Sequence, residues 1–147
     1  MNLLFVRWLM AMTIGMVAST AAVQANAGPV SESDAHQIQG VIAAQLAAFA
    51  DDDADGAFQT ATPTVREAIG SSGRFLAMVR GAYPMVFRPA SVTFQKPDDD
   101  EGKVLQLVEI TDRSAKSWLA LFALERQPDG SWRISGCTVT ENPWQPS

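Results

Sequence analysis

The chain has 147 residues, of which 47% are hydrophobic and 18% are charged, and its net charge at pH 7 is −5. This length allows one ordinary domain with its own hydrophobic core and leaves little room for a second domain. The acidic charge, with arginines dispersed along the chain, excludes the basic surface that binds phosphate backbones, so no nucleic-acid partner is expected.

The first 27 residues have the three parts of a secretory signal peptide. Met1–Arg7 carries one positive charge, Trp8–Ala18 is almost wholly apolar, and Ala25-Asn26-Ala27 is a small-residue cleavage site. An uncleaved membrane anchor is the alternative, but the apolar run is shorter than the roughly 20 residues of a spanning helix. We expect cleavage near Ala27, export to the periplasm or the medium, and no stable membrane anchor afterwards. The remaining single domain, residues 28–147, has a net charge of −6 because Arg7 is lost.

Cys137 is the only cysteine of the chain, and His36 is the only histidine. A lone cysteine cannot form an internal disulfide, so the apolar core must stabilise the exported domain. One cysteine and one histidine leave a structural zinc site two soft ligands short. We interpret Cys137 as a small buried residue that faces the helices, rather than a nucleophile activated by His36. No metal or cofactor is expected.

Helical patterns fill the first half of the mature chain. Apolar residues recur with helical spacing between Asp34 and Ala50 and predict one long amphipathic helix. Capping and proline signals predict three shorter helices, over Gly56–Ala61, over Thr64–Ile69 and around Phe75–Val79, the last ending before Tyr83-Pro84.

The acidic stretch after the long helix matches the opening of a calcium loop, D-x-D-x-D-G, through Asp51, Asp53, Asp55 and Gly56. Such a loop ends in a bidentate glutamate, and Thr62 at that position cannot supply two carboxylate oxygens. We therefore favour helix capping, in which the acidic residues end one helix and Asp53 or Asp55 caps the next.

Period-two patterns replace the helical ones from Val86 onward. Val86–Gln95 is predicted as a first strand with Pro89 near its start, and the acidic Lys96–Gly102 is predicted as a solvated hairpin connection. A meander of about four antiparallel strands is completed by Lys103–Thr111, Lys116–Arg126 and Trp132–Thr140. The fold class is therefore α+β, with N-terminal helices packed on a curved antiparallel sheet.

The strand Lys116–Arg126 is apolar on both faces, which predicts that it is covered on both sides. If the helices cover only one side, the other side carries an apolar patch on which a homodimer is plausible. The residues of that patch are Leu105, Leu107, Leu119, Leu121 and Ala123.

The order of several short motifs resembles a family of exported bacterial proteins catalogued as domain of unknown function 4864. The matching residues are Gln45–Phe49 with Asp52 and Asp53, Ala57-Phe58, Ala61-Thr62-Pro63, Phe75, Met78-Val79, Tyr83-Pro84, Arg88-Pro89, Gln106, Trp118 and Asp129–Cys137. The family is placed in the nuclear-transport-factor-two-like, or cystatin-like, superfamily. The resemblance therefore implies the cone-shaped α+β fold of that superfamily, and it implies no activity.

In cone-shaped relatives such as ketosteroid isomerase, a mostly apolar pocket opens between the helices and the concave sheet face. There an acid removes a proton and hydroxyl groups stabilise the enolate. Glu109, the one carboxylate in the middle of an apolar strand, is the candidate acid and Tyr83 the candidate donor, although neither lies in a motif that matches the isomerase. Glu109 and Gln106 are three positions apart on the same strand, so their side chains point to opposite faces and cannot both line one cavity.

Arg88, Gln106 and Tyr83 are the candidate ligand-binding residues. A guanidinium at Arg88 would hold a ligand carboxylate, although an ion pair with an aspartate or a contact with helix carbonyls is the alternative. Gln106 is a buried amide that needs hydrogen-bond partners. We expect a non-catalytic binding module for a small molecule or a protein partner, and the alternative is a small isomerase- or hydratase-like enzyme that uses a carboxylate in the cone pocket.

Overall fold

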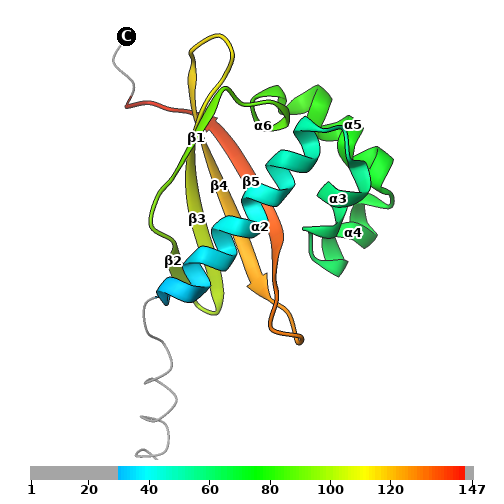
Figure 1. Ribbon diagram of the computed structural model, residues 1–147, viewed down its shortest axis with the longest axis vertical. Helices are drawn as coiled ribbons and strands as arrows, with labels where there is room; N and C mark the ends of the chain where they lie inside the picture. Colours follow the sequence, from blue (N-terminus) through cyan, green and yellow to red (C-terminus); the bar gives the residue numbers. More distant parts are fainter. Residues whose placement is uncertain (1–29, 145–147) are drawn as a thin grey trace, which may run out of the picture.

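A computed structural model of the protein describes residues 30–144. The expected signal peptide lies outside these residues, and both its cleavage and export of the chain stay predictions. In the described part, helices come first and strands follow (Figure 1). The helices are α2 (Glu32–Ala50), α3 (Ala54–Gln59), α4 (Pro63–Ile69), α5 (Ser72–Ala82) and α6 (Pro84–Phe87). The strands are β1 (Ser91–Phe94), β2 (Asp98–Asp100), β3 (Lys103–Thr111), β4 (Ser117–Arg126) and β5 (Trp132–Glu141). The α+β prediction is confirmed.

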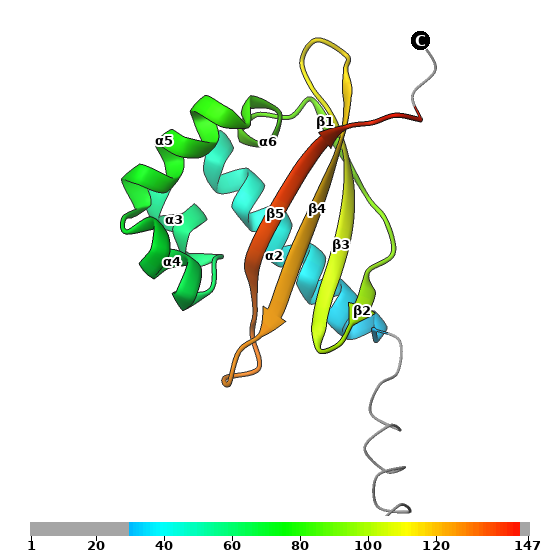
Figure 2. The ribbon, with the colours of Figure 1, turned by 180° about the vertical axis from the view of Figure 1, so that it is seen from behind.

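Helix α2 crosses one face of the sheet diagonally (Figures 1 and 2). Its N-cap is Ser31, whose Oγ accepts a hydrogen bond from the backbone N–H of Asp34 at 3.0 Å. Its sheet side includes Ile38, Ile42 and Phe49, each of which is 0% exposed. Burying one such side chain stabilises the fold by roughly 1.5–3 kcal/mol, so packing on the sheet holds this helix in place.

The shorter helices α3 to α6 form a group beside β5 (Figures 1 and 2). Asp53 caps α3 by accepting from the N–H of Gly56 at 3.0 Å. Thr62 and Ser71 cap α4 and α5 in the same way. The predicted capping role of the acidic stretch is therefore confirmed, and α3 starts two residues earlier than expected, at Ala54.

The strands form one antiparallel sheet in the order β1-β3-β4-β5, and β2 pairs with β3 beside β1. Gln106 lies opposite Phe122, which in turn lies opposite Cys137, so all three share the inner face toward α2. Leu105, Leu107 and Glu109 alternate with buried residues and lie on the outer face. A bulge at Ala123/Leu124 shifts the register between β4 and β5.

Two expectations about the first strands are wrong. Val86 and Phe87 belong to α6, because Pro84 starts a helical turn and a short apolar run suits a buried helix as well as a strand. The acidic segment after Pro97 is not a simple solvated turn, since Asp98–Asp100 pairs with β3 as β2. The backbone groups of a free strand edge can pair with another segment whatever side chains that segment carries, acidic ones included. The sheet therefore has five strands rather than about four.

The outer face of the sheet carries no described helix, as the view from behind shows (Figure 2). Leu121 is 39% exposed, and its apolar neighbours on this face are half-buried. The expectation that β4 is covered on both sides is therefore wrong within residues 30–144, because the chain supplies helices for one face only.

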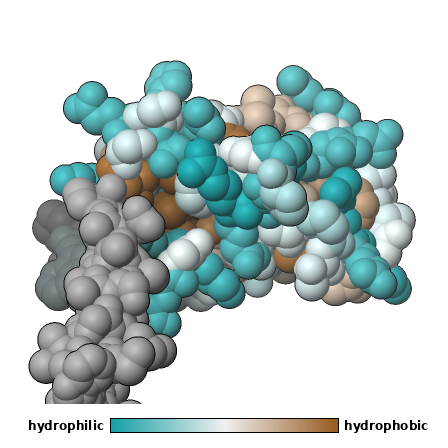
Figure 3. All heavy atoms as spheres, turned by 90° about the horizontal axis from the view of Figure 1, so that it is seen from below, coloured by the Kyte–Doolittle hydropathy of each residue, from teal (hydrophilic) through white to brown (hydrophobic). Residues whose placement is uncertain are grey.

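The end of the molecule that carries the β2–β3 and β4–β5 turns is mainly hydrophilic, with separate hydrophobic areas between polar side chains (Figure 3). Across residues 30–144, no helix combines the length and the hydropathy needed to cross a membrane.

Candidate functional site

A pocket of about 340 Å³ opens between α5 and the inner face of β5, and we call it the α5–β5 pocket. Its walls are mostly apolar, and no charged side chain is among the described residues that line it. The rings of Phe49 and Phe75 pack on each other with centroids 5.3 Å apart and form part of the wall. The other lining residues are Gln45, Ala61, Val65, Ile69, Met78, Val79, Ala82, Tyr83, Val86, Ile134, Gly136, Cys137 and Val139.

Cys137 brings a thiol to this pocket. It faces the helices as expected, but it is exposed and not buried, because the pocket opens onto β5 at this position. Although the side chain is open to the pocket, the apolar surroundings desolvate the thiolate and raise the pKa of Cys137 to about 12. The thiol is therefore neutral at pH 7 and can offer only a weak hydrogen bond to a ligand.

Tyr83 reaches the pocket from the other side, at the point where α5 ends and α6 begins. The residue as a whole is 38% exposed. Together with the thiol of Cys137 and the buried amide of Gln45, it supplies the polar groups of a mostly apolar lining.

The floor of the pocket is fixed by hydrogen bonds between the α3–α4 connection and β5. The N–H of Thr62 donates to the carbonyl of Ile134 at 3.0 Å, and the N–H of Ile134 donates to the carbonyl of Thr60 at 2.8 Å. The Thr60 hydroxyl also accepts from the Gln45 amide at 3.0 Å. These bonds connect α2, the α3–α4 connection and β5, all of which line the pocket, and they fix the positions of these segments relative to one another.

Sequence reasoning missed most of this pocket. The apolar residues of α5 recur at intervals of three and four, at Phe75, Met78, Val79 and Ala82, which is the pattern of a helix face packed on a core. The same stripe lines the pocket, and only the exposure of Met78 at 45% distinguishes a cavity wall from core.

Gln106 does not reach the pocket. It is 0% exposed beneath α2, and its Nε2 donates to the carbonyls of Gln95 at 2.6 Å and Leu107 at 2.9 Å. Its Oε1 has no hydrogen-bond partner among the described residues. The amide therefore holds the chain where β1 ends and lies within the core.

Arg88 lies at a separate place, near the C-terminal end of α2. Its Nη2 is 3.1 Å from Oδ2 of Asp52, and its guanidinium stacks over the Phe87 ring at 5.1 Å. Arg80 contacts the other oxygen of Asp52, also at 3.1 Å. Arg88 therefore forms the ion pair with an aspartate that the sequence offered as the alternative to ligand binding. Arg88, Gln106 and Tyr83 therefore do not form one site.

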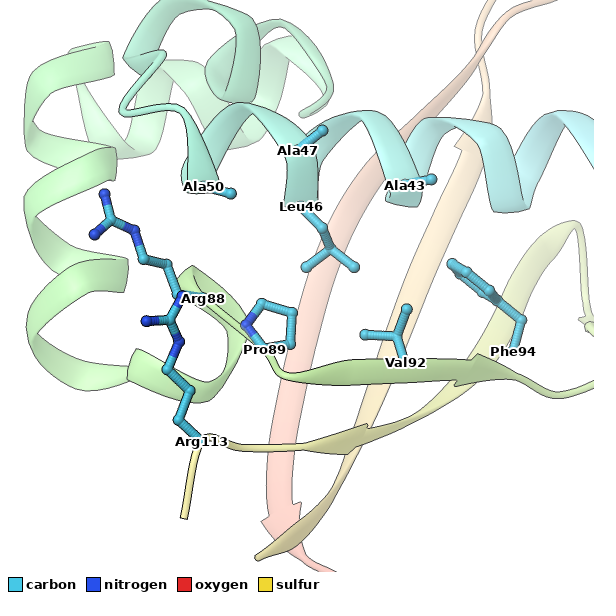
Figure 4. Close-up of a pocket in the computed structure, with 9 residues that line it drawn as sticks. All are labelled: Ala43, Leu46, Ala47, Ala50, Arg88, Pro89, Val92, Phe94 and Arg113. Atoms are coloured by element: carbon cyan, nitrogen blue, oxygen red, sulfur yellow. The ribbon is translucent and has the colours of Figure 1, made fainter. Parts of the chain in front are cut away.

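Arg88 also lines an apolar groove of about 450 Å³ between α2 and β1, which we call the α2–β1 groove (Figure 4). Arg113, from the turn between β3 and β4, rises at the same end of the groove as Arg88. The remaining lining is apolar and consists of Ala43, Leu46, Ala47, Ala50, Pro89, Val92 and Phe94. Sequence analysis did not single out Arg113, because only the fold brings this turn to the end of α2.

Glu109, the candidate catalytic acid, lies on the outer face between Thr93 and Leu119 of the neighbouring strands. It is half-buried there, and its Oε1 is 3.4 Å from the Ser117 hydroxyl. Since the α5–β5 pocket opens on the inner face, Glu109 cannot remove a proton from a molecule in that pocket.

The comparisons with known proteins concern the fold and the family. The chain is similar to a protein of unknown function with a cystatin-like fold from Nostoc punctiforme, at 13% identity, a TM-score of 0.48, and coverage of 81% of this chain and 98% of that chain. It is also similar to an NTF-2 like protein of unknown function from Burkholderia xenovorans, at 14% identity, a TM-score of 0.46, and coverage of 76% and 88%.

No curated protein matches the chain. The family model described as Domain of unknown function (DUF4864) matches residues 31–147, which include all of the helices and strands described above. The chain therefore belongs to the DUF4864 family.

Proposed function

We propose that this domain binds a small, largely apolar, uncharged molecule in the α5–β5 pocket. The observation that carries the proposal is a concave cavity of about 340 Å³ with mostly apolar walls and three polar side chains in its lining, Gln45, Tyr83 and Cys137. Ligand sites are typically concave, mostly apolar cavities of about 300–1,000 Å³ with a few polar groups that orient the ligand. An ionised ligand would find no opposite charge there, and transfer of its charge from water would be unfavourable.

Binding is favoured over isomerase-like or hydratase-like chemistry by the chemical character of the lining. Proton abstraction needs a base within hydrogen-bond reach of the ligand. The described residues that line the pocket include no carboxylate, and Cys137 is a neutral thiol with its pKa raised to about 12. The groups present, Tyr83 and Cys137, suit hydrogen bonding to a carbonyl or hydroxyl oxygen of a bound molecule.

A fluorescence titration with Nile red, an uncharged dye that emits more strongly in apolar surroundings, tests this proposal. We expect saturable binding by the wild-type protein. Ala82 lies on the pocket-lining stripe of α5, so Ala82→Trp fills the cavity and should weaken binding at least about tenfold. Ala77 is exposed on the same helix away from that stripe, so Ala77→Trp is the matched control and should bind as the wild type does. If both variants bound Nile red with equal affinity and kept the melting temperature of the wild type, the proposal would be wrong.

A further inference from the structure

The α2–β1 groove combines an apolar channel with a cationic end. Leu46, Val92 and Phe94 lie along its length, whereas Arg88 and Arg113 stand together at one end (Figure 4). Ala43 and Ala50 mark its extent on α2, and seven residues of helix correspond to about 10 Å. The groove is therefore long enough for a medium-length hydrocarbon chain, and its chemistry changes from apolar to positive along one direction.

The positive charge at this end is only partly balanced. Asp52 is the single carboxylate paired with both Arg80 and Arg88. Arg113 makes no hydrogen bond or ion pair within residues 30–144. Three guanidinium groups therefore gather with two carboxylates, Asp52 and Asp112, which leaves a local excess of positive charge on a protein whose net charge is negative. Such a local excess favours an anionic group from a ligand.

The neighbouring Asp112 is engaged elsewhere. Its Oδ1 accepts from the backbone N–H groups of Ser114 at 2.8 Å and Lys116 at 2.9 Å, and its Oδ2 accepts from the Trp118 indole at 2.9 Å. These donors, the indole first, lower the pKa of Asp112. They also order the turn that carries Arg113. The Arg113 guanidinium does not pair with the adjacent carboxylate of Asp112.

From this arrangement we propose a second binding site, for an amphiphilic monocarboxylate whose carboxylate lies between Arg88 and Arg113 and whose hydrocarbon chain lies in the α2–β1 groove. Guanidinium groups hold carboxylates through paired, charge-assisted hydrogen bonds. The chain of the ligand would cover Leu46, Val92 and Phe94, of which Val92 and Phe94 are half-buried. This site uses none of the residues that line the α5–β5 pocket.

Isothermal titration calorimetry of the purified protein with decanoate, decanol and acetate tests the inference. We expect decanoate to bind, and both the uncharged alcohol and the short acid to bind at least about tenfold more weakly, because each lacks one of the two required parts. Raising the salt concentration should weaken decanoate binding, since both arginines are exposed. If decanol bound as tightly as decanoate, the proposed role of the arginines would be wrong.

Variants locate the site. Arg113→Gln should weaken decanoate binding about tenfold and leave the melting temperature unchanged, since Arg113 has no partner in the described part of the chain to lose. Arg74→Gln removes an exposed positive charge on α5, outside the groove lining, and should have no effect. Ala82→Trp should also leave decanoate binding intact. If Ala82→Trp abolished binding while Arg113→Gln did not, decanoate would occupy the α5–β5 pocket and the inference would be overturned.

Discussion

The carboxylate of Asp52 lies 3.1 Å from the guanidinium of Arg88, which follows it by 36 residues in the chain. This contact connects the end of α2 to the segment that enters the sheet. Asp52 adopts a positive φ of 55°, which directs the chain away from α2 and into the cap of α3. One residue thus both turns the backbone and positions an arginine beside the α2–β1 groove.

Replacing Asp52 with asparagine separates these two roles. Asparagine tolerates the positive φ, so the turn should persist and the free energy of unfolding should fall by no more than about 1 kcal/mol, as for exposed ion pairs. The loss of negative charge should strengthen decanoate binding by roughly two- to fivefold. Urea unfolding and calorimetry measure the two effects. Weaker decanoate binding by a variant of normal stability would contradict the proposed anion site.

Gln106→Leu should destabilise the fold without changing ligand binding. The substitution removes the donor to the Gln95 carbonyl, and a lost buried hydrogen bond costs about 1 kcal/mol after the relief of the unpartnered Oε1 is included. Gln39→Leu is the matched control, because its amide reaches the same carbonyl only at 3.5 Å. Urea unfolding should show a larger loss for Gln106→Leu. A variant as stable as the wild type would mean that the buried amide contributes nothing net.

Alkylation of Cys137 should report the apolar character of the pocket. The reactive species is the thiolate, and the folded protein keeps the thiol protonated until the pH approaches about 12, against an ordinary value of 9.0. At pH 8 iodoacetamide should therefore react more slowly with the folded protein than with the chain unfolded in urea. Mass spectrometry over time measures both rates, and equal rates would show that the thiol is not desolvated.

The raised pKa of Cys137 also affects how the free energy of unfolding depends on pH. Between pH 9 and pH 12 the unfolded chain loses the thiol proton while the folded chain keeps it, so the unfolded state binds fewer protons there. The contribution of Cys137 is thus constant below about pH 9 and falls as the pH rises toward 12. Cys137→Ala should remove this contribution, so its unfolding free energy should fall less steeply over that pH range than that of the wild type. Parallel curves for the two proteins would contradict the assignment.

The outer face of the sheet supports a further prediction, that two copies pair there. Its apolar centre is the patch of Leu105, Leu107, Leu119, Leu121 and Ala123, and the carboxylate of Glu125 lies between Lys103 and Arg133 at one end of that patch. A two-fold axis through the patch would place the apolar surface of one copy on that of the other, so the pairing would bury apolar surface on both copies.

We therefore expect the protein to be a dimer in solution and Leu121→Lys to be a monomer, because a lysine at the centre of the patch would have to be desolvated. Trp144→Lys is the control, since Trp144 is 84% exposed and outside the patch. Sedimentation equilibrium distinguishes the states. A wild-type monomer at all concentrations would refute this pairing.

Sequence patterns predicted the long helix and the three long strands well, because their periodicity extends over many residues. Lys103–Thr111 has the predicted bounds, with Gln106 inside and Glu109 outside. The patterns were wrong at Val86 and at Asp98–Asp100, where four residues or fewer adopt a structure decided by tertiary contacts. A short segment has too few repeats for its period to be read.

The candidate sites were less predictable for a different reason. Tyr83 and Arg88 are close in sequence, yet one lines the α5–β5 pocket and the other lines the α2–β1 groove, because α6 turns the chain between them. Arg113 reaches the groove only through the β3–β4 turn. Cavities arise where packing between elements is incomplete, and the residues that line them have the same apolar pattern as core residues.

Methyl-group NMR with Nile red as the probe tests the central claim most directly, because it locates a bound molecule without any mutation. We expect chemical-shift changes for Val79, Ile134 and Val139, which line the α5–β5 pocket, and none for Leu105 and Leu121 on the outer face. Shift changes confined to Leu105 and Leu121, with the pocket methyl groups unmoved at saturation, would contradict it.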